Sequence, residues 1–271
     1  IEIYNGKRFE LLYHYRVPEE LPPPPIPEDI PPAGTILRDS NGKVAFPGGL
    51  EDWFTLLNQG RIFTAMANSD THGLDDEPGV PRTYVPVSED RPGAIDELEI
   101  VKGIQNQRAF LTNGPFATVT VTGNGACLAT KTGEELGRQE CGLGEMVGAS
   151  DGKVTVRVDT KSAPWVRINR VNFIVNGAQV ASVEGDNESL ATVTQSLDFE
   201  ADGWVVVEIV GDGNMFPVVL PREIPSIQVS DALGSIGASF GFEFSAFGNL
   251  APDEVTAVHP YAFSNPVLVD V

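Results

Sequence analysis

The feature of this sequence that most constrains its fold is an alternation of apolar and polar residues that begins near Phe116. Short runs with a two-residue period recur up to about residue 210, and turn signals such as Asn176-Gly177 separate them. A two-residue period places the apolar side chains on one face of a strand. The pattern therefore predicts an antiparallel β-sandwich. The expected strands lie at 117–121, 154–158, 166–175, 191–197 and 204–210.

The region before Phe116 has a different pattern. Apolar residues recur at helical spacing from Leu50 to Leu57, and Gly60 follows as a stop signal. A buried strand is expected over 61–67, a second helix over 95–108 and another strand over 110–112. This order of elements predicts part of an α/β barrel or sheet. The apolar side of the second helix holds Ile95, Leu98, Val101 and Ile104.

These patterns divide the chain into three parts, so the predicted fold class is α/β plus all-β. Residues 1–115 form the α/β part and contain a Pro-rich loop at 18–34, which favours extended polyproline structure. Residues 116–220 form the β-sandwich domain. Residues 221–271 form an extended C-terminal segment, which we expect to wrap over another surface.

The composition limits the partners of the protein. Asp and Glu total 38 and Lys and Arg total 18, so the 271-residue chain carries a net charge of −20. This acidity argues against nucleic acid and against anionic lipid surfaces. No apolar run approaches the roughly 20 residues of a membrane helix, so we expect no membrane span. The acidic, Gly- and Pro-rich composition suits an exported protein, periplasmic or extracellular.

The chain has two cysteines, Cys127 and Cys141, in a Gly-rich polar stretch. A disulfide between them would close a short loop and contribute about 3 kcal/mol in the chain-entropy model. Two unpaired thiols are the alternative. A structural zinc site would need four ligands, and no histidine lies near the pair.

The strongest chemical signal is the polar turn at residues 68–73, which follows the expected buried strand. Sites in α/β proteins form at the carboxyl ends of strands, and Asp70 and His72 stand there two residues apart. Carboxylate and imidazole are ligands for Zn, Mn or Fe, and such a metal generates hydroxide from water near neutral pH. A turn with a surface histidine is the alternative.

Asn68 to Gly73, with the helical segment 53–60 before it, resembles the last metal motif of the PHP (polymerase and histidinol phosphatase) superfamily. The closer similarity is to metallohydrolases of the CehA/McbA type. It extends in order over nearly the whole chain. The other matching stretches are Ile1-Glu2-Ile3-Tyr4-Asn5-Gly6, Pro78-Gly79-x-Pro81-Arg82-Thr83-Tyr84-Val85, Thr112-Asn113-Gly114-Pro115-Phe116 and Pro260-Tyr261-Ala262-x-Ser264-Asn265-Pro266.

The resemblance implies the last part of a distorted β/α barrel, followed by the sandwich, with two or three divalent metal ions in the complete protein. The family takes ligands from an early His-x-His pair as well as from the late Asp-x-His. This chain has only His14, His72 and His259, and no His-x-His pair. We therefore expect that an N-terminal segment of the same protein completes the site, and that the chain alone is inactive. A degenerate relative is the alternative.

Two further side chains are candidates for substrate contact. Arg82 follows the metal motif, and its guanidinium would clamp a substrate oxyanion or phosphate. Pairing with one of the many carboxylates is the alternative. His14 would line the rim of the site, or it is a surface or interface histidine. Glu2 and Asn5, on the strand that opens the chain, are outside candidates for metal ligands.

The function that these observations predict is metal-dependent hydrolysis of an ester-type bond in a small molecule, either a phosphoester or a carbamate or carboxylic ester. Asp70 and His72 would hold the metal. The alternative is a non-catalytic exported module that mediates surface binding or assembly through the sandwich. A homo-oligomer is compatible with both functions.

Overall fold

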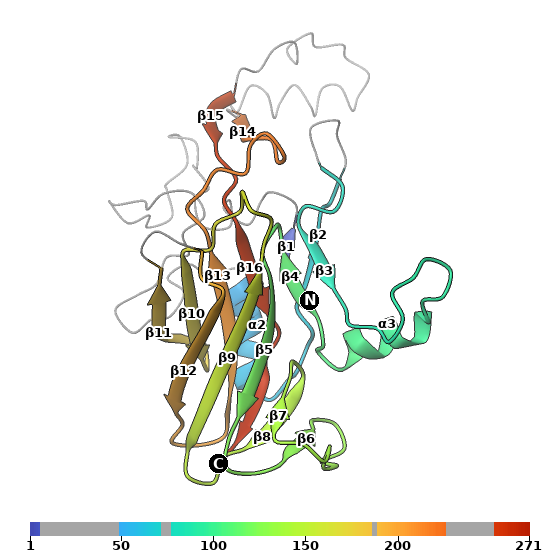
Figure 1. Ribbon diagram of the computed structural model, residues 1–271, viewed down its shortest axis with the longest axis vertical. Coiled ribbons are helices and arrows are strands. Elements are labelled where there is room, and N and C mark those ends of the chain that lie inside the picture. Colours follow the sequence, from blue (N-terminus) through green and yellow to red (C-terminus); the bar gives the residue numbers. More distant parts are fainter. Residues whose placement is uncertain (6–48, 72–76, 186–188, 226–251) are drawn as a thin grey trace, which may run out of the picture.

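The computed structural model describes residues 1–5, 49–71, 77–185, 189–225 and 252–271, and strands dominate this part of the chain (Figure 1). The elements, in chain order, are β1 (Glu2–Asn5), α2 (Gly49–Asn58), β2 (Met66–Asn68), β3 (Arg82–Tyr84), α3 (Glu97–Gln105), β4 (Phe110–Thr112), β5 (Phe116–Thr122), β6 (Cys127–Ala129), β7 (Glu140–Cys141), β8 (Glu145–Gly148), β9 (Lys153–Lys161), β10 (Arg170–Val175), β11 (Ala178–Glu184), β12 (Thr192–Asp198), β13 (Gly203–Val210), β14 (Arg222–Pro225), β15 (Pro252–Thr256), β16 (Tyr261–Ser264) and β17 (Val267–Asp270).

Two sheets pack face to face around the larger hydrophobic core. The four-stranded sheet has the order β12-β9-β5-β7, and the nine-stranded sheet has the order β3-β4-β16-β13-β17-β8-β6, with β10 and β11 joined beside β13. Val119, Val156 and Val193 of the smaller sheet share this core with Phe173 and Val207 of the larger one. This arrangement agrees with the alternation of the sequence, which leaves one apolar face on each strand of the smaller sheet.

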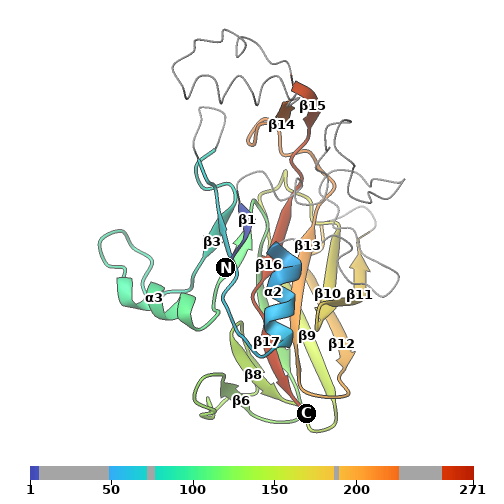
Figure 2. The same ribbon diagram turned by 180° about the vertical axis from the view of Figure 1, so that it is seen from behind.

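The other face of the nine-stranded sheet is covered by α2, β1 and β2, as Figure 2 shows for the helix. The ring of Phe54 lies 5.2 Å from that of Trp204, and the ring of Trp53 lies 5.9 Å from that of Phe263. The indole Nε1 of Trp204 donates to Oδ1 of Asn58 at 2.9 Å. The residues that recur at helical spacing therefore form α2, and the apolar side of this helix is fully buried.

Two buried asparagines join segments that are far apart in the sequence. Oδ1 of Asn265 accepts from the amide of Ala65 at 2.8 Å, and its Nδ2 donates to the carbonyl oxygens of Ala65 and Ala109. Asn113 exchanges hydrogen bonds with the backbone of Tyr261 through both its amide oxygen and its own N–H. Both residues belong to motifs on which the family resemblance rests, and here they hold the structure together.

The C-terminal segment differs from expectation, because its last strands do not wrap over a separate surface. Strand β16 pairs with β4 and β13, and β17 pairs with β13 and β8, so both lie inside the nine-stranded sheet. Strand β4 precedes residue 116, and a division between residues 115 and 116 therefore crosses this sheet. Local patterns do not show which distant strands will pair, so the sequence alone does not place β16 and β17 inside this sheet.

Two strands are shorter than expected. The strand expected over 61–67 comprises only Met66–Asn68. The strand expected over 166–175 begins at Arg170, because a turn in which the amide of Val166 donates to the carbonyl oxygen of Ala163 precedes it. The helix predicted to start near Leu50 is present as Gly49–Asn58.

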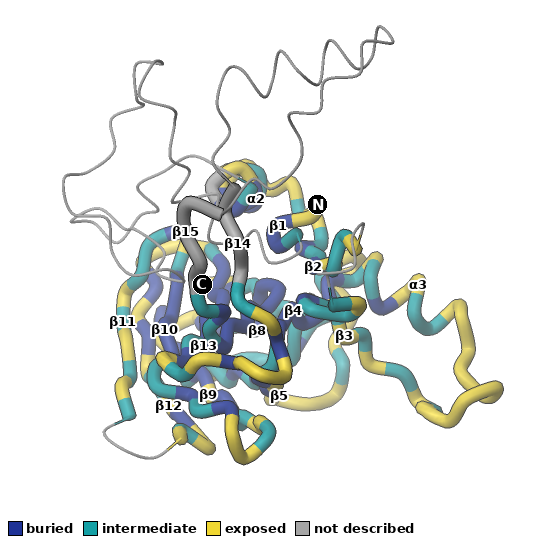
Figure 3. The backbone as a smooth tube through the Cα atoms, turned by 90° about the horizontal axis from the view of Figure 1, so that it is seen from above, coloured by how far each residue is buried: buried dark blue, intermediate teal, exposed yellow. Residues whose placement is uncertain are grey.

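The second expected helix is present as α3, but its apolar side is not buried. Leu98 and Val101 are 63% and 47% exposed, and Ile95 is also exposed. The helix contacts the rest of the chain through Gly103 instead, where a Cβ would collide with the side chain of Val85. Figures 1 and 3 show α3 on a largely exposed arm beside the sheets. Among the described residues, no helix is long and apolar enough to cross a membrane.

Replacement of Asn265 by alanine tests the role of this buried amide. The substitution leaves three buried backbone groups without their partner, so we expect the free energy of unfolding to fall by about 3 kcal/mol or more. Urea unfolding followed by circular dichroism measures the change. The exposed Asn124, whose side chain bonds only to Ser150 among the described residues, is the matched control. An Asn265→Ala variant that is as stable as Asn124→Ala would contradict the role.

Candidate functional site

The predicted metal motif lies at the carboxyl ends of two parallel strands. Strands β1 and β2 pair in parallel, and Asn5 is the register partner of Asn68. Both asparagines end their strands at the same edge of this two-stranded sheet, and Asp70 follows two residues later. The side-chain oxygen Oδ1 of Asn5 is buried and accepts no hydrogen bond from any described residue. A buried oxygen of this kind calls for a donor or a cation.

Asp70 has a φ of 46°, in the left-handed region that few residues other than glycine adopt. Such backbone outliers concentrate at functional sites. His72, the second predicted ligand, lies outside the described residues, and so does His14.

The end of this sheet carries two oxygen-bearing side chains of the kind that bind metal ions. These are the carboxylate of Asp70 and the amide oxygen of Asn5, which suit a hard divalent cation. Within the described residues, no cluster of three or more His, Cys, Asp or Glu side chains is placed to hold a metal ion. Glu2, the other outside candidate, is exposed. The described residues therefore supply two candidate oxygen ligands and not a full ligand set.

Arg82 lies on the opposite side of β3 from the metal motif. The hydroxyl of Thr83 accepts from the amide of Ala67 and donates to its carbonyl oxygen, both at 2.8 Å, so Thr83 faces β2. Strand alternation turns Arg82 and Tyr84 the other way. The guanidinium of Arg82 lies 5.6 Å from the centre of the Tyr84 ring, and its Nη1 donates to the carbonyl oxygen of Gly79. Its role as a substrate clamp stays a prediction.

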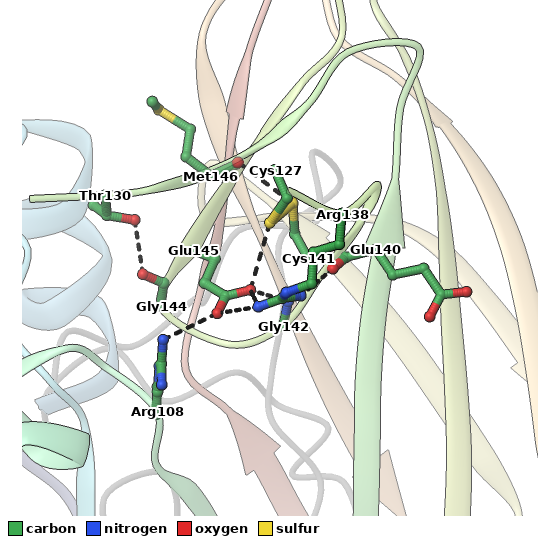
Figure 4. Close-up of a disulfide and its surroundings, with 10 residues drawn as sticks. All are labelled: Arg108, Cys127, Thr130, Arg138, Glu140, Cys141, Gly142, Gly144, Glu145 and Met146. Atoms are coloured by element: carbon green, nitrogen blue, oxygen red, sulfur yellow. Dashed lines mark hydrogen bonds and ion pairs between the residues drawn. A yellow bond between two sulfur atoms is a disulfide. The ribbon is translucent and has the colours of Figure 1, made fainter. Parts of the chain in front are cut away.

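The structure joins Cys127 and Cys141 in a disulfide, which decides between the two alternatives for these residues. Both cysteines are fully buried, and the bond links β6 to β7 across 14 residues of sequence (Figure 4). The bond fixes the hairpin that carries Arg138 and Glu140.

An ionic cluster that the sequence did not indicate lies beside this disulfide. Figure 4 shows Arg108 and Arg138 converging on Glu145, which is 4% exposed. Nη2 of Arg138 donates to both carboxylate oxygens at 2.5 Å, and Nη2 of Arg108 donates to Oε1 at 3.2 Å. The amide of Gly142 adds a fourth hydrogen bond at 2.7 Å. The carboxylate is thereby compensated despite its burial.

The cluster escaped the sequence analysis because its members carry no local signal. Glu145 is one of 38 acidic residues, and 37 positions separate it from Arg108. In the structure the neighbouring Gly144 has a φ of +76°. A Cβ there would collide with the backbone oxygen of Asn106, so only glycine lets the Glu145 segment approach the end of α3.

Comparisons of the chain with protein-family models, with curated proteins and with solved structures found no match. The assignment of function therefore depends on the motif at the end of β2 and on the geometry around it.

The disulfide predicts a dependence of stability on reduction. The chain-entropy model gives about 3 kcal/mol for a loop of this length, so the reduced protein should unfold at a clearly lower urea concentration than the oxidised one. Urea unfolding with and without a phosphine reductant measures the difference. The double variant Cys127→Ala, Cys141→Ala should show the same stability under both conditions. A wild-type protein that unfolds equally with and without reductant would contradict this prediction.

Proposed function

We propose that the chain is part of a metal-dependent hydrolase of ester-type bonds, of the PHP superfamily and the CehA/McbA type that its motifs resemble. The observation that carries the proposal is the pairing of Asn5 with Asn68 at the carboxyl ends of two parallel strands, immediately before Asp70. The side-chain oxygen of Asn5 is buried without a partner among the described residues, and Asp70, whose backbone is left-handed, follows Asn68 by two residues.

The order of elements around this motif supports a β/α barrel. Among the described elements, strand β1, helix α2 and parallel strand β2 come in the order of a βαβ unit, with residues 6–48 between β1 and α2 outside the described part. In β/α barrels the catalytic residues come from the carboxyl ends of the strands and from the loops that follow them. Asp70 and His72 occupy that position in the sequence, directly after β2.

The proposed role of these residues is to hold a divalent metal ion. Asp70 would supply a carboxylate and His72 an imidazole, and Asn5 would supply its amide oxygen to the ion or to its hydration shell. When bound, Zn, Mn or Fe supplies a water-derived nucleophile near neutral pH. The substrate would be a small phosphoester, carbamate or carboxylic ester.

Asp70→Asn in the full-length protein tests this proposal. The substitution keeps the shape of the side chain but removes its charge. We expect metal affinity to fall by about 100-fold or more, because loss of an outer-shell partner alone typically costs about 10- to 100-fold. Elemental analysis after equilibration with Zn, Mn or Fe measures metal content. Hydrolysis of nitrophenyl acetate, nitrophenyl phosphate and a naphthyl carbamate measures activity.

The control is Asp90→Asn, which makes the same chemical change at an exposed residue. It should leave metal content and hydrolysis unchanged. An Asp70→Asn protein with wild-type metal content and wild-type rates would refute the proposal. In that case a non-catalytic binding or assembly module would be the better description.

A further inference from the structure

A cavity of about 590 Å³ lies between the edges of the two facing sheets. Tyr84 of β3 and Phe110 of β4 line it from the nine-stranded sheet, and residues 116–120 of β5 line it from the four-stranded sheet. The hairpin with Arg138 and the Glu145 segment complete the wall. This volume lies in the range of small-molecule sites, which are typically about 300–1,000 Å³.

Aromatic contacts and strand pairing bound the cavity at two ends. At one end the ring of Phe116 makes edge contacts with Tyr84 at 5.3 Å and with Phe110 at 5.4 Å, so three strands are bridged by aromatic rings. At the other end β7 pairs with β5 at Val121 and Thr122. Between them, residues 116–120 pair only with β9 among the described strands. A recess bounded in this way at two ends accommodates a compact molecule better than an extended peptide.

The polar group best placed to meet a ligand in this recess is Arg108. Its side chain is 46% exposed, and within the described part of the chain its only hydrogen bond is the one from Nη2 to Glu145. Nε and Nη1 are therefore available to a ligand. Glu145 is already compensated by Arg138, which holds both of its oxygens. Arg108 thus adds a positive charge that is not required to neutralise the carboxylate of Glu145.

Besides Arg108, Arg138 and Glu145, the recess is lined by one further charged residue, Glu140. Figure 4 shows its side chain directed away from Arg108 and Glu145. On β9, two strands away from β7, Arg157 is paired with Asp159, and the pKa of Arg157 is raised mainly by that pair and only slightly by the charge of Glu140. The carboxylate of Glu140 is therefore directed away from the guanidinium of Arg108.

We propose that this recess binds a small carboxylate with an aromatic or branched aliphatic body. The body would pack against Tyr84, Phe110 and Phe116, and the carboxylate would accept hydrogen bonds from Arg108. A guanidinium matches a carboxylate in both geometry and charge. On a chain with a net charge of −20, a paired arginine cluster beside apolar walls is a distinctive place for an anion. The inference is independent of the metal motif.

Calorimetric titration with phenylacetate tests the proposal. The uncharged phenylacetamide is the matched control ligand. We expect phenylacetate to bind at least about 10-fold more tightly, the factor typical of hydrogen bonds to a charged group. Arg108→Ala should weaken phenylacetate by a similar factor and leave phenylacetamide unchanged. The Nε–Hε resonance of Arg108 should shift in NMR spectra on addition of phenylacetate, 3-phenylpropionate or 4-methylvalerate.

Two further variants separate binding from folding. Thr118→Trp places a large side chain on the wall at an exposed position and should block the acid and the amide alike. Arg91→Ala removes an exposed arginine that pairs with Glu89 and should change nothing. Urea unfolding verifies that each variant is folded.

Three results with these small ligands would overturn the proposal. They are equal affinity for phenylacetate and phenylacetamide, unchanged phenylacetate binding in a folded Arg108→Ala protein, and no shift of the Arg108 resonance with any of the three acids at millimolar concentration. Binding of an extended peptide in place of the acids would have the same consequence. None of these results bears on metal binding at Asp70, so the two proposals fail separately.

Discussion

Burial of strand β13 on both faces is the constraint on which the rest of the structure depends. Val205, Val207 and Ile209 point into the core shared with the four-stranded sheet, while Trp204 and Val206 point toward α2. A strand that is apolar on both faces must be covered on both sides. The four-stranded sheet covers one face, and α2, β1 and β2 cover the other. The βαβ part is therefore held against the sheet, and the end of β2 has a fixed position relative to it.

Apolar packing alone would not fix the register between these layers, and buried polar groups supply the rest. Asn265, which follows β16 of the nine-stranded sheet, makes three hydrogen bonds to the backbone of Ala65 and Ala109. These bonds join the segment before β2 to the sheet. Between the strands, Oε1 of Glu208 accepts from the hydroxyl of Tyr261 and Oε2 accepts from Nδ2 of Asn172. A shift of one residue would leave such groups unsatisfied inside the protein, so they select one arrangement.

The sequence predicted the elements whose signal is local. Helix α2 and strands β5, β9, β12 and β13 follow directly from apolar periodicity. It did not predict the central position of β16 and β17, because strand partners depend on contacts between distant segments. It also predicted α3, but periodicity did not show that the apolar side of this helix is exposed and that Gly103 makes the close contact with Val85. For the site, the motif gave Asp70 from local spacing, whereas Arg108 and Glu145 meet only in three dimensions.

Strand β3 separates the two proposed sites and shows how they can be distinguished. Thr83 is bonded to Ala67, three residues before Asp70, while Tyr84 lines the recess on the other side of the same strand. Arg82 lies with Tyr84 and not with Thr83. A role for Arg82 in clamping a substrate at the metal would therefore have to be exerted from the Tyr84 side of β3. A change at Thr83 acts on the strand that leads to the metal motif, whereas a change at Tyr84 acts on the wall of the recess.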